Sequence, residues 1–261
     1  MAEFFNKESM PKCIILDWDG TLVDIEPVIH KAYKETLKEI NSPLKDAWSP
    51  IDTHAQNGLA PADIFNNKLI WGEHIGENGL AKKLFYQNYH KFMTEDENAP
   101  YLKDGALELL QTINAAYPTT RVVILAAKTN AILKQEVEKK PELAPWVHVV
   151  LGTDPERGFS KQNDIIFYEA VYGLTISKDP EIRKKEVIHI GDNIDKDNYF
   201  AQICGISSIV INDKNKEATH TSLKEVSDEI KSAFRERNMA LLKNKRNIPS
   251  ASDMRDTNSR V

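Results

Sequence analysis

The chain has 261 residues, of which 41% are hydrophobic and 28% are charged, and its formal net charge is −5. No apolar run is long enough to cross a bilayer, the mild acidity gives no support for a nucleic-acid partner, and residues 1–8 lack a secretory signal pattern. Its two cysteines, Cys13 and Cys204, do not indicate a disulfide framework. These features predict a globular protein of the cytoplasm, large enough for a core domain with a smaller insert.

The first predicted strand covers residues 12–17, and acidic residues end it. Its apolar, β-branched run is typical of a buried parallel strand, and Asp17 and Asp19 stand at its carboxyl end. Charges are costly there unless they meet a cation or a reacting group, and ligands bind at the carboxyl ends of such strands. The pattern predicts a metal-assisted nucleophile with a neighbouring acid or base, against the alternative of a surface turn.

Residues 25–100 carry helical patterns and no convincing strand. Apolar side chains recur at helical spacing over 29–40 and again over 80–92, and residues 61–65 open a further helix. A return linker over 100–105 leads into a predicted helix over 106–113. A helical unit therefore follows the first strand, before the other strands begin.

Four more strands are predicted, and helical segments separate most of them; they cover residues 121–127, 147–152, 187–191 and 207–212. Strands that alternate with helices form a parallel, doubly wound sheet. The strand over 121–127 leads into a cation, a hydroxyl and an amide, namely Lys128, Thr129 and Asn130. The strand over 187–191 ends in an acidic cluster.

That acidic cluster contains Asp192 and Asp197, with Asp195 as a nearby alternative. Lys161 stands at the predicted start of a helix over 164–173. A lysine at this position opposes the helix dipole, which favours a functional reason for its presence.

The C-terminal segment 236–261 is polar and basic. It is predicted to be a tail outside the core, with its last residues, 247–261, disordered.

Taken together, these segments resemble the motifs of the haloacid dehalogenase-like hydrolase superfamily, over about residues 12–213. The motifs lie, in chain order, at residues 17–21, at Thr129 with Asn130, at Lys161, and at residues 191–197. The resemblance implies a five-stranded, mostly parallel, Rossmann-like core over 1–24 and 101–235, with the first strand central between those at 121–127 and 187–191. It also implies that residues 25–100 form an inserted α-helical cap domain.

The same resemblance implies a phosphatase mechanism. Asp17 would attack phosphorus and form an aspartyl-phosphate, and Asp19 would act as acid and then as base. Lys161 and Thr129 would stabilise the phosphoryl oxygens. Further phosphate contacts would come from Gly20, Thr21 and Asn130. Mg²⁺ would be held by Asp17, the main-chain carbonyl of Asp19, Asp192 and Asp197. Alternatively, Asp197 would hold the ammonium of Lys161 and would not bind the metal.

The expected function is hydrolysis of a small phosphorylated metabolite, because an acid at position 19 resembles the phosphatases and phosphomutases of the superfamily. A phosphomutase and a catalytically weak binding module stay open as alternatives. The second motif is the weakest, because a register aligned on Lys128 would place Ala126 where the hydroxyl is expected. The sequence indicates neither the natural substrate nor the oligomeric state.

Overall fold

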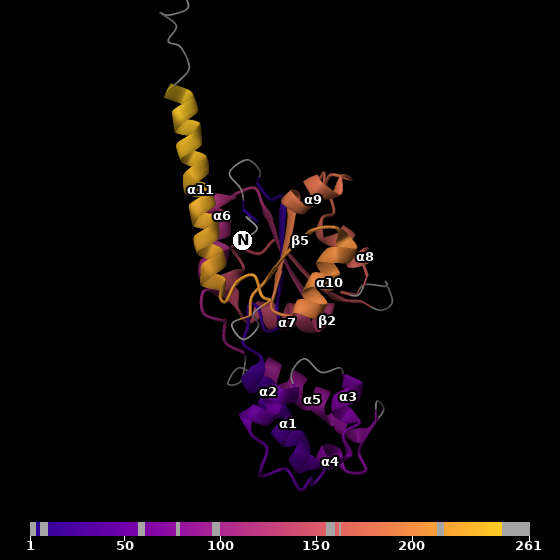
Figure 1. Cartoon of the computed structure of the whole chain (residues 1–261). Coiled ribbons are helices and arrows are strands. Elements are labelled where there is room, and N and C mark those ends of the chain that lie inside the picture. Colours follow the sequence, from indigo (N-terminus) through magenta and orange to yellow (C-terminus); the bar gives the residue numbers. More distant parts are fainter. Residues whose placement is uncertain are drawn as a thin grey trace, which may run out of the picture.

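A parallel five-stranded sheet forms the centre of the molecule (Figure 1). The computed structural model describes residues 4–5, 10–56, 61–76, 79–95, 100–154, 160–161, 163–212 and 217–246. The strand order is β3-β2-β1-β4-β5, and every neighbouring pair is parallel. The strands are β1 (Cys13–Asp17), β2 (Arg121–Thr129), β3 (Val149–Thr153), β4 (Val187–Gly191) and β5 (Ser207–Val210). The expected doubly wound core with a central first strand is confirmed.

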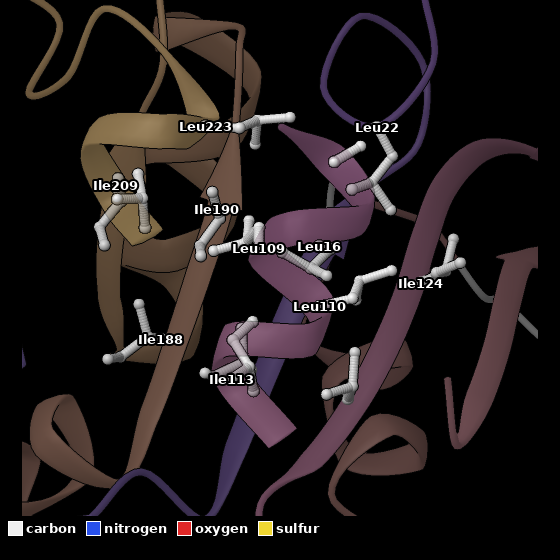
Figure 2. Packing of buried hydrophobic residues seen from close by; sticks show 14 of the residues in the cluster. Leu16, Leu22, Leu109, Leu110, Ile113, Ile124, Ile188, Ile190, Ile209 and Leu223 are labelled. Carbon is white, nitrogen blue, oxygen red and sulfur yellow. The ribbon is translucent and has the colours of Figure 1, made fainter. Parts of the chain in front are cut away.

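Helices cover both faces of the sheet, so β1 is apolar on both faces. Ile14 and Leu16 pack in one hydrophobic cluster, and Cys13 and Ile15 pack in another on the opposite face. The first face is covered by α6 (Ala106–Ala116), α7 (Asn130–Glu138) and α11 (Leu223–Arg246), and the second by α8 (Ile165–Ala170) and α10 (Ile194–Cys204). Figure 2 shows Leu109, Leu110 and Ile113 of α6 packed over the first face of the sheet.

Two shorter helical elements complete the core, η2 (Pro141–Leu143) and α9 (Pro180–Glu186). Figure 1 shows α11 beside α6 and extending past the sheet. The expected tail therefore begins as helix, up to residue 246, and its predicted disordered part, 247–261, lies outside the described residues. No helix in the described part of the chain is long and apolar enough to cross a membrane.

Residues 26–94 form a helical unit with its own hydrophobic cluster. It contains α1 (Glu26–Glu39), α2 (Pro50–Gln56), α3 (Pro61–Phe65), α4 (Lys68–Trp71) and α5 (Leu80–Thr94). The cluster is rich in aromatic rings, with Tyr33 at its centre against Trp48, Trp71 and Phe85. Figure 1 shows this unit beyond the end of the sheet that lies near α7.

The two connections between the core and the helical unit run side by side. The chain leaves β1 through a tight turn in which Leu22 and Val23 donate to the carbonyl of Trp18. Val23 then pairs with Leu102 on the returning chain, and Asp24 donates to the carbonyl of Tyr101. These contacts hold the segment that follows Asp17 against the chain that returns from the helical unit to the core.

Leu37 of α1 gives a test of the helical unit's cluster, because its side chain is fully buried there. Leu37→Ala should lower the free energy of unfolding by about 3 kcal/mol, the cost of a core cavity. Urea unfolding followed by tryptophan fluorescence measures this. Leu69→Ala in α4 is the matched control, since Leu69 is 84% exposed, and should change stability by less than about 0.5 kcal/mol. Equal losses in the two variants would contradict this packing.

Candidate active site

A cavity of about 750 Å³ lies at the carboxyl ends of β1 and β4, between the core and the helical unit. Asp17, Asp19 and Asp192 line it from the core. Ile29 of α1 and His54 of α2 line it from the helical unit. The cavity is therefore bounded by both parts of the chain, at the edge of the sheet where ligands bind in parallel α/β folds.

Asp17, the last residue of β1, is buried, with 7% of its surface exposed. Its Oδ1 accepts a hydrogen bond of 2.5 Å from Lys161 Nζ. Burial raises the pKa of Asp17 well above its usual range, and the carboxylates of Asp197 and Asp192 raise it further, while Lys161 opposes the shift. Asp17 is thus held in place at the floor of the cavity by a single ammonium group.

Asp197 is fully buried in the first turn of α10, and both of its oxygens are occupied. Oδ1 accepts from Lys161 at 2.8 Å and lies 2.9 Å from His189 Nε2, and Oδ2 accepts from the Asn193 amide at 2.9 Å. Burial alone would raise the pKa of Asp197, but Lys161 and the hydrogen bond to His189 hold it well below its usual range. Asp197 therefore serves as the anchor of Lys161.

Lys161 is itself buried, and its two carboxylate partners keep it charged. Burial alone would lower the pKa of Lys161, but the carboxylates of Asp17 and Asp197 raise it above its usual range. The side chain forms a cationic bridge between the end of β1 and the start of α10.

Asp192 completes the acidic group, and glycines make room for it. Thr21 Oγ1 donates to Asp192 Oδ1 at 3.2 Å. Gly20 has φ +80°, and a Cβ at this position would collide with the Asp192 carboxylate. A Cβ on Gly191 would likewise collide with the carboxylate of Asp197. The close approach of backbone and carboxylates thus requires glycine at both positions.

The three carboxylates form a set that suits a hard divalent cation. One oxygen from each of Asp17, Asp192 and Asp197 lies within 4.8 Å of the others. Lys161 pairs with two of them, and its single positive charge does not balance three ionised carboxylates. Burial, with the charge of Asp197, raises the pKa of Asp192 as well. Oxygen ligands of this kind bind Mg²⁺, and the site fits the expected metal.

Asp19 also lines the cavity, but its carboxylate belongs to a different ion-pair group. Its Oδ1 accepts from Lys128 Nζ at 2.7 Å, and the same nitrogen lies 2.6 Å from Glu136 Oε2 on α7. The direction of the Asp19 carboxylate is therefore set by Lys128 of β2 and, through Lys128, by Glu136 of α7.

Thr129 and Asn130 are not brought to the cavity. Thr129 is exposed at the end of β2, and Asn130 Oδ1 accepts from the Gly152 amide at 3.3 Å. β2 runs two residues beyond its predicted end, with a register shift against β3, and this carries Thr129 to a pairing with Thr153. Ala127 lines the cavity instead. The role of Thr129 as a phosphoryl donor stays a prediction, and so does the alternative register, in which Ala126 stands at the hydroxyl position.

Three residues that contact the site were not predicted to do so. His189 lies within β4, and its Nε2 lies 2.9 Å from Asp197 Oδ1. Lys128 and Glu136 were not assigned a role either. One signal was present in the sequence, since His189 is a single polar residue within an apolar strand, and such residues are buried only with a partner.

The family model of the haloacid dehalogenase-like hydrolases matches residues 11–205 of the chain. No curated protein matches the chain.

Several solved structures share the fold. One is a hydrolase of the same superfamily from Ehrlichia chaffeensis, 18% identical, with a TM-score of 0.56 over 87% of this chain and 98% of that one. Another is the hydrolase YfnB from Bacillus subtilis bound to magnesium, 16% identical, with a TM-score of 0.58 over 84% and 98%. A third, described as a phosphoglycolate phosphatase, comes from Lactobacillus delbrueckii and is 15% identical, with a TM-score of 0.56 over 84% and 98%.

Lys161→Met tests the electrostatic balance of the site. Without the ammonium, buried carboxylates repel one another, and the free energy of unfolding in the presence of a chelator should fall by about 3–5 kcal/mol. Urea unfolding measures the difference. Lys196→Met is the control, because Lys196 lines the same cavity but is exposed. A Lys161→Met protein as stable as this control would show that Lys161 does not hold the acidic group together.

Proposed function

Because the chain belongs to the haloacid dehalogenase-like hydrolase family, we propose that it is a Mg²⁺-dependent phosphatase acting on a phosphate monoester of a small metabolite. The observation that carries the proposal is the buried Lys161 bridge between Asp17 and Asp197, beside Asp192. A phosphoryl group needs both a nucleophile and nearby cations, and this arrangement offers both. Neighbours in fold that are described as phosphatases support the choice of reaction.

In the first half of the reaction, Asp17 attacks the phosphorus atom. A bond forms between a carboxylate oxygen and phosphorus, and the ester bond to the leaving oxygen breaks. Lys161 neutralises negative charge on the phosphoryl oxygens, and Gly20 and Thr21 of the turn after Asp17 line the same cavity.

Asp19 is the proposed acid and base. It gives a proton to the leaving oxygen as the ester bond breaks. In the second half it takes a proton from a water molecule, which attacks phosphorus and releases inorganic phosphate and the free carboxylate of Asp17. Asp19 lines the cavity, which supports contact with the leaving group.

Asp17, the main-chain carbonyl of Asp19 and Asp192 are the proposed ligands of Mg²⁺. The ion would offset the excess negative charge of the carboxylates and polarise the phosphoryl group. Asp197 already contacts Lys161, His189 and the Asn193 amide, which favours a role in holding Lys161 over direct ligation. We therefore assign Asp197 to holding Lys161.

The helical unit over residues 25–100 is the proposed cap domain. Ile29 and His54 reach the cavity from it, so it would contact the substrate beyond the phosphate and exclude water during the reaction. The magnesium-bound structure of YfnB reveals interdomain movement in that protein, which supports opening and closing here. Cys13 and Cys204 are unpaired, which supports a reducing compartment such as the cytoplasm.

A catalytically weak binding module is the second candidate. It is favoured by one observation, namely that Ala127 lines the cavity and Thr129 is not among the lining residues. Such a protein would bind a phosphorylated compound at Lys161 and release no phosphate.

Phosphate release decides between the two candidates. A panel of sugar phosphates, phosphoglycolate and nucleotides is incubated with the protein, with Mg²⁺ or with excess chelator. Release from at least one compound should require Mg²⁺, and Asp17→Asn should lower it by more than about a thousandfold with an unchanged melting temperature. Turnover in excess chelator, or by Asp17→Asn, would contradict the mechanism; binding without any release would favour the binding module.

Thr129→Val tests the second motif. Thr129 is exposed and outside the cavity, so this variant should keep kcat within about twofold, whereas loss of a donor to the phosphoryl group would cost about a hundredfold. Steady-state kinetics on the best substrate of the panel measures the effect. A hundredfold loss of kcat with an unchanged melting temperature would show that the Thr129 hydroxyl does donate to the phosphoryl group.

A further inference from the structure

A second cluster of charged side chains, of which Glu136 is buried and Asp19 and Lys128 are half-buried, lies beside the Asp17 site and joins the core to the helical unit. Lys128 Nζ lies 2.7 Å from Asp19 Oδ1, 2.6 Å from Glu136 Oε2 and 3.5 Å from the hydroxyl oxygen of Tyr89. Asp19, Lys128 and Glu136 belong to the core, and Tyr89 belongs to α5 of the helical unit. An ammonium group has three N–H donors, and these three oxygens can take all of them.

The burial of Glu136 costs free energy. Glu136 is 2% exposed, and its Oε1 has no hydrogen-bond partner among the described residues. Burial raises the pKa of Glu136, and Lys128 opposes that shift. Because a buried ion pair of this kind contributes little net stability compared with an apolar pair, its value lies in the geometry that it imposes.

The geometry it imposes concerns Asp19. Glu136 Oε2 accepts a hydrogen bond of 2.8 Å from Trp18 Nε1, and Trp18 is the residue between Asp17 and Asp19. Glu136 thus fixes the backbone segment through Trp18 and the carboxylate of Asp19 through Lys128. Both contacts restrict the direction in which Asp19 points.

Tyr89 adds a contact that depends on the helical unit. Burial, together with the carboxylates of Asp19 and Glu136, raises the pKa of Tyr89 well above its usual range, so the hydroxyl keeps its proton. A neutral hydroxyl can donate to Asp19 while it accepts from Lys128. This contact exists only when the helical unit lies against the core.

We propose that Tyr89, Lys128 and Glu136 are positioning residues that aim Asp19 at the leaving group when the helical unit closes. Lys128 and Glu136 belong to the core and hold Asp19 whether or not the helical unit is closed. Tyr89 belongs to the helical unit, so its contact with the cluster forms only on closure. The proposal rests on the proposed phosphatase function, because aiming an acid matters only where a leaving group must be protonated.

The dependence on leaving group separates this role from a structural one. An alkyl oxygen leaves poorly without a proton, whereas p-nitrophenolate leaves well without one. The ratio kcat/KM reports the steps up to departure of the leaving group and not the later hydrolysis of the aspartyl-phosphate. A misaimed Asp19 should therefore lower kcat/KM for alkyl phosphates and spare p-nitrophenyl phosphate.

The experiment compares Tyr89→Phe with wild type on p-nitrophenyl phosphate and on the alkyl phosphate that the wild type hydrolyses fastest. We expect kcat/KM to fall by about tenfold or more on the alkyl ester and to change less than about twofold on the aryl ester. Glu136→Gln keeps an acceptor for Trp18 but loses the charge that holds Lys128, and it should show the same selective loss. Tyr86→Phe is the matched control on the same helix; Tyr86 is 46% exposed, and kcat/KM should stay unchanged on both esters.

The outcomes separate the positioning role from the phosphatase activity. Equal losses on the two esters in variants that melt at the wild-type temperature, or no loss in either variant, would overturn the positioning role while leaving the phosphatase intact. A wild-type protein that hydrolyses neither ester would overturn the proposed function, and the positioning role with it. Melting temperatures of both variants distinguish a folding defect, which lowers kcat/KM on both esters together, from a misaimed acid.

Discussion

Three carboxylates, two of them buried and that of Asp192 half-buried, meet at one edge of the sheet. The arrangement around them depends on the positive charge that keeps them together. Lys161 is the cation that the chain itself supplies, between Asp17 and Asp197. Burial raises the pKa of Asp17 and of Asp192, the neighbouring carboxylates raise it further, and Lys161 opposes the shift without cancelling it. A site with this excess of negative charge favours a divalent cation, and then a phosphoryl group beside it.

The geometry of the parallel sheet makes this concentration of charge possible. β1 and β4 are neighbours, so residues that follow them arrive at the same edge. Gly20 and Gly191 leave the space that the carboxylates occupy. The helical unit then bounds the cavity on its far side, through residues such as Ile29 and His54, so the carboxylates lie at the boundary between the two parts of the chain.

Most of the core could be predicted from the sequence because its signals are local. Runs of Val and Ile indicated the positions of all five strands, and acidic residues directly after β1 and β4 indicated the site. The end of β2 could not be predicted for a non-local reason, since it depends on the pairing of β2 with β3. The contacts of Glu136 with Trp18 and Lys128 were equally hidden, because 118 residues separate Glu136 from Trp18 and no repeat or spacing links them. Helix α11 passes through a charged segment, so composition suggested a tail where a helix continues to residue 246.

The central claim is that the carboxylate of Asp17 becomes phosphorylated during turnover. The most direct measurement is rapid acid quenching of the protein as it hydrolyses a ³²P-labelled ester, followed by peptide mapping, since acid preserves an acyl phosphate. The account predicts label on the peptide that contains residues 13–24, attached at Asp17, and its loss on treatment with hydroxylamine. Label on a different residue, or substrate turnover with no labelled protein at any quench time, would contradict the account.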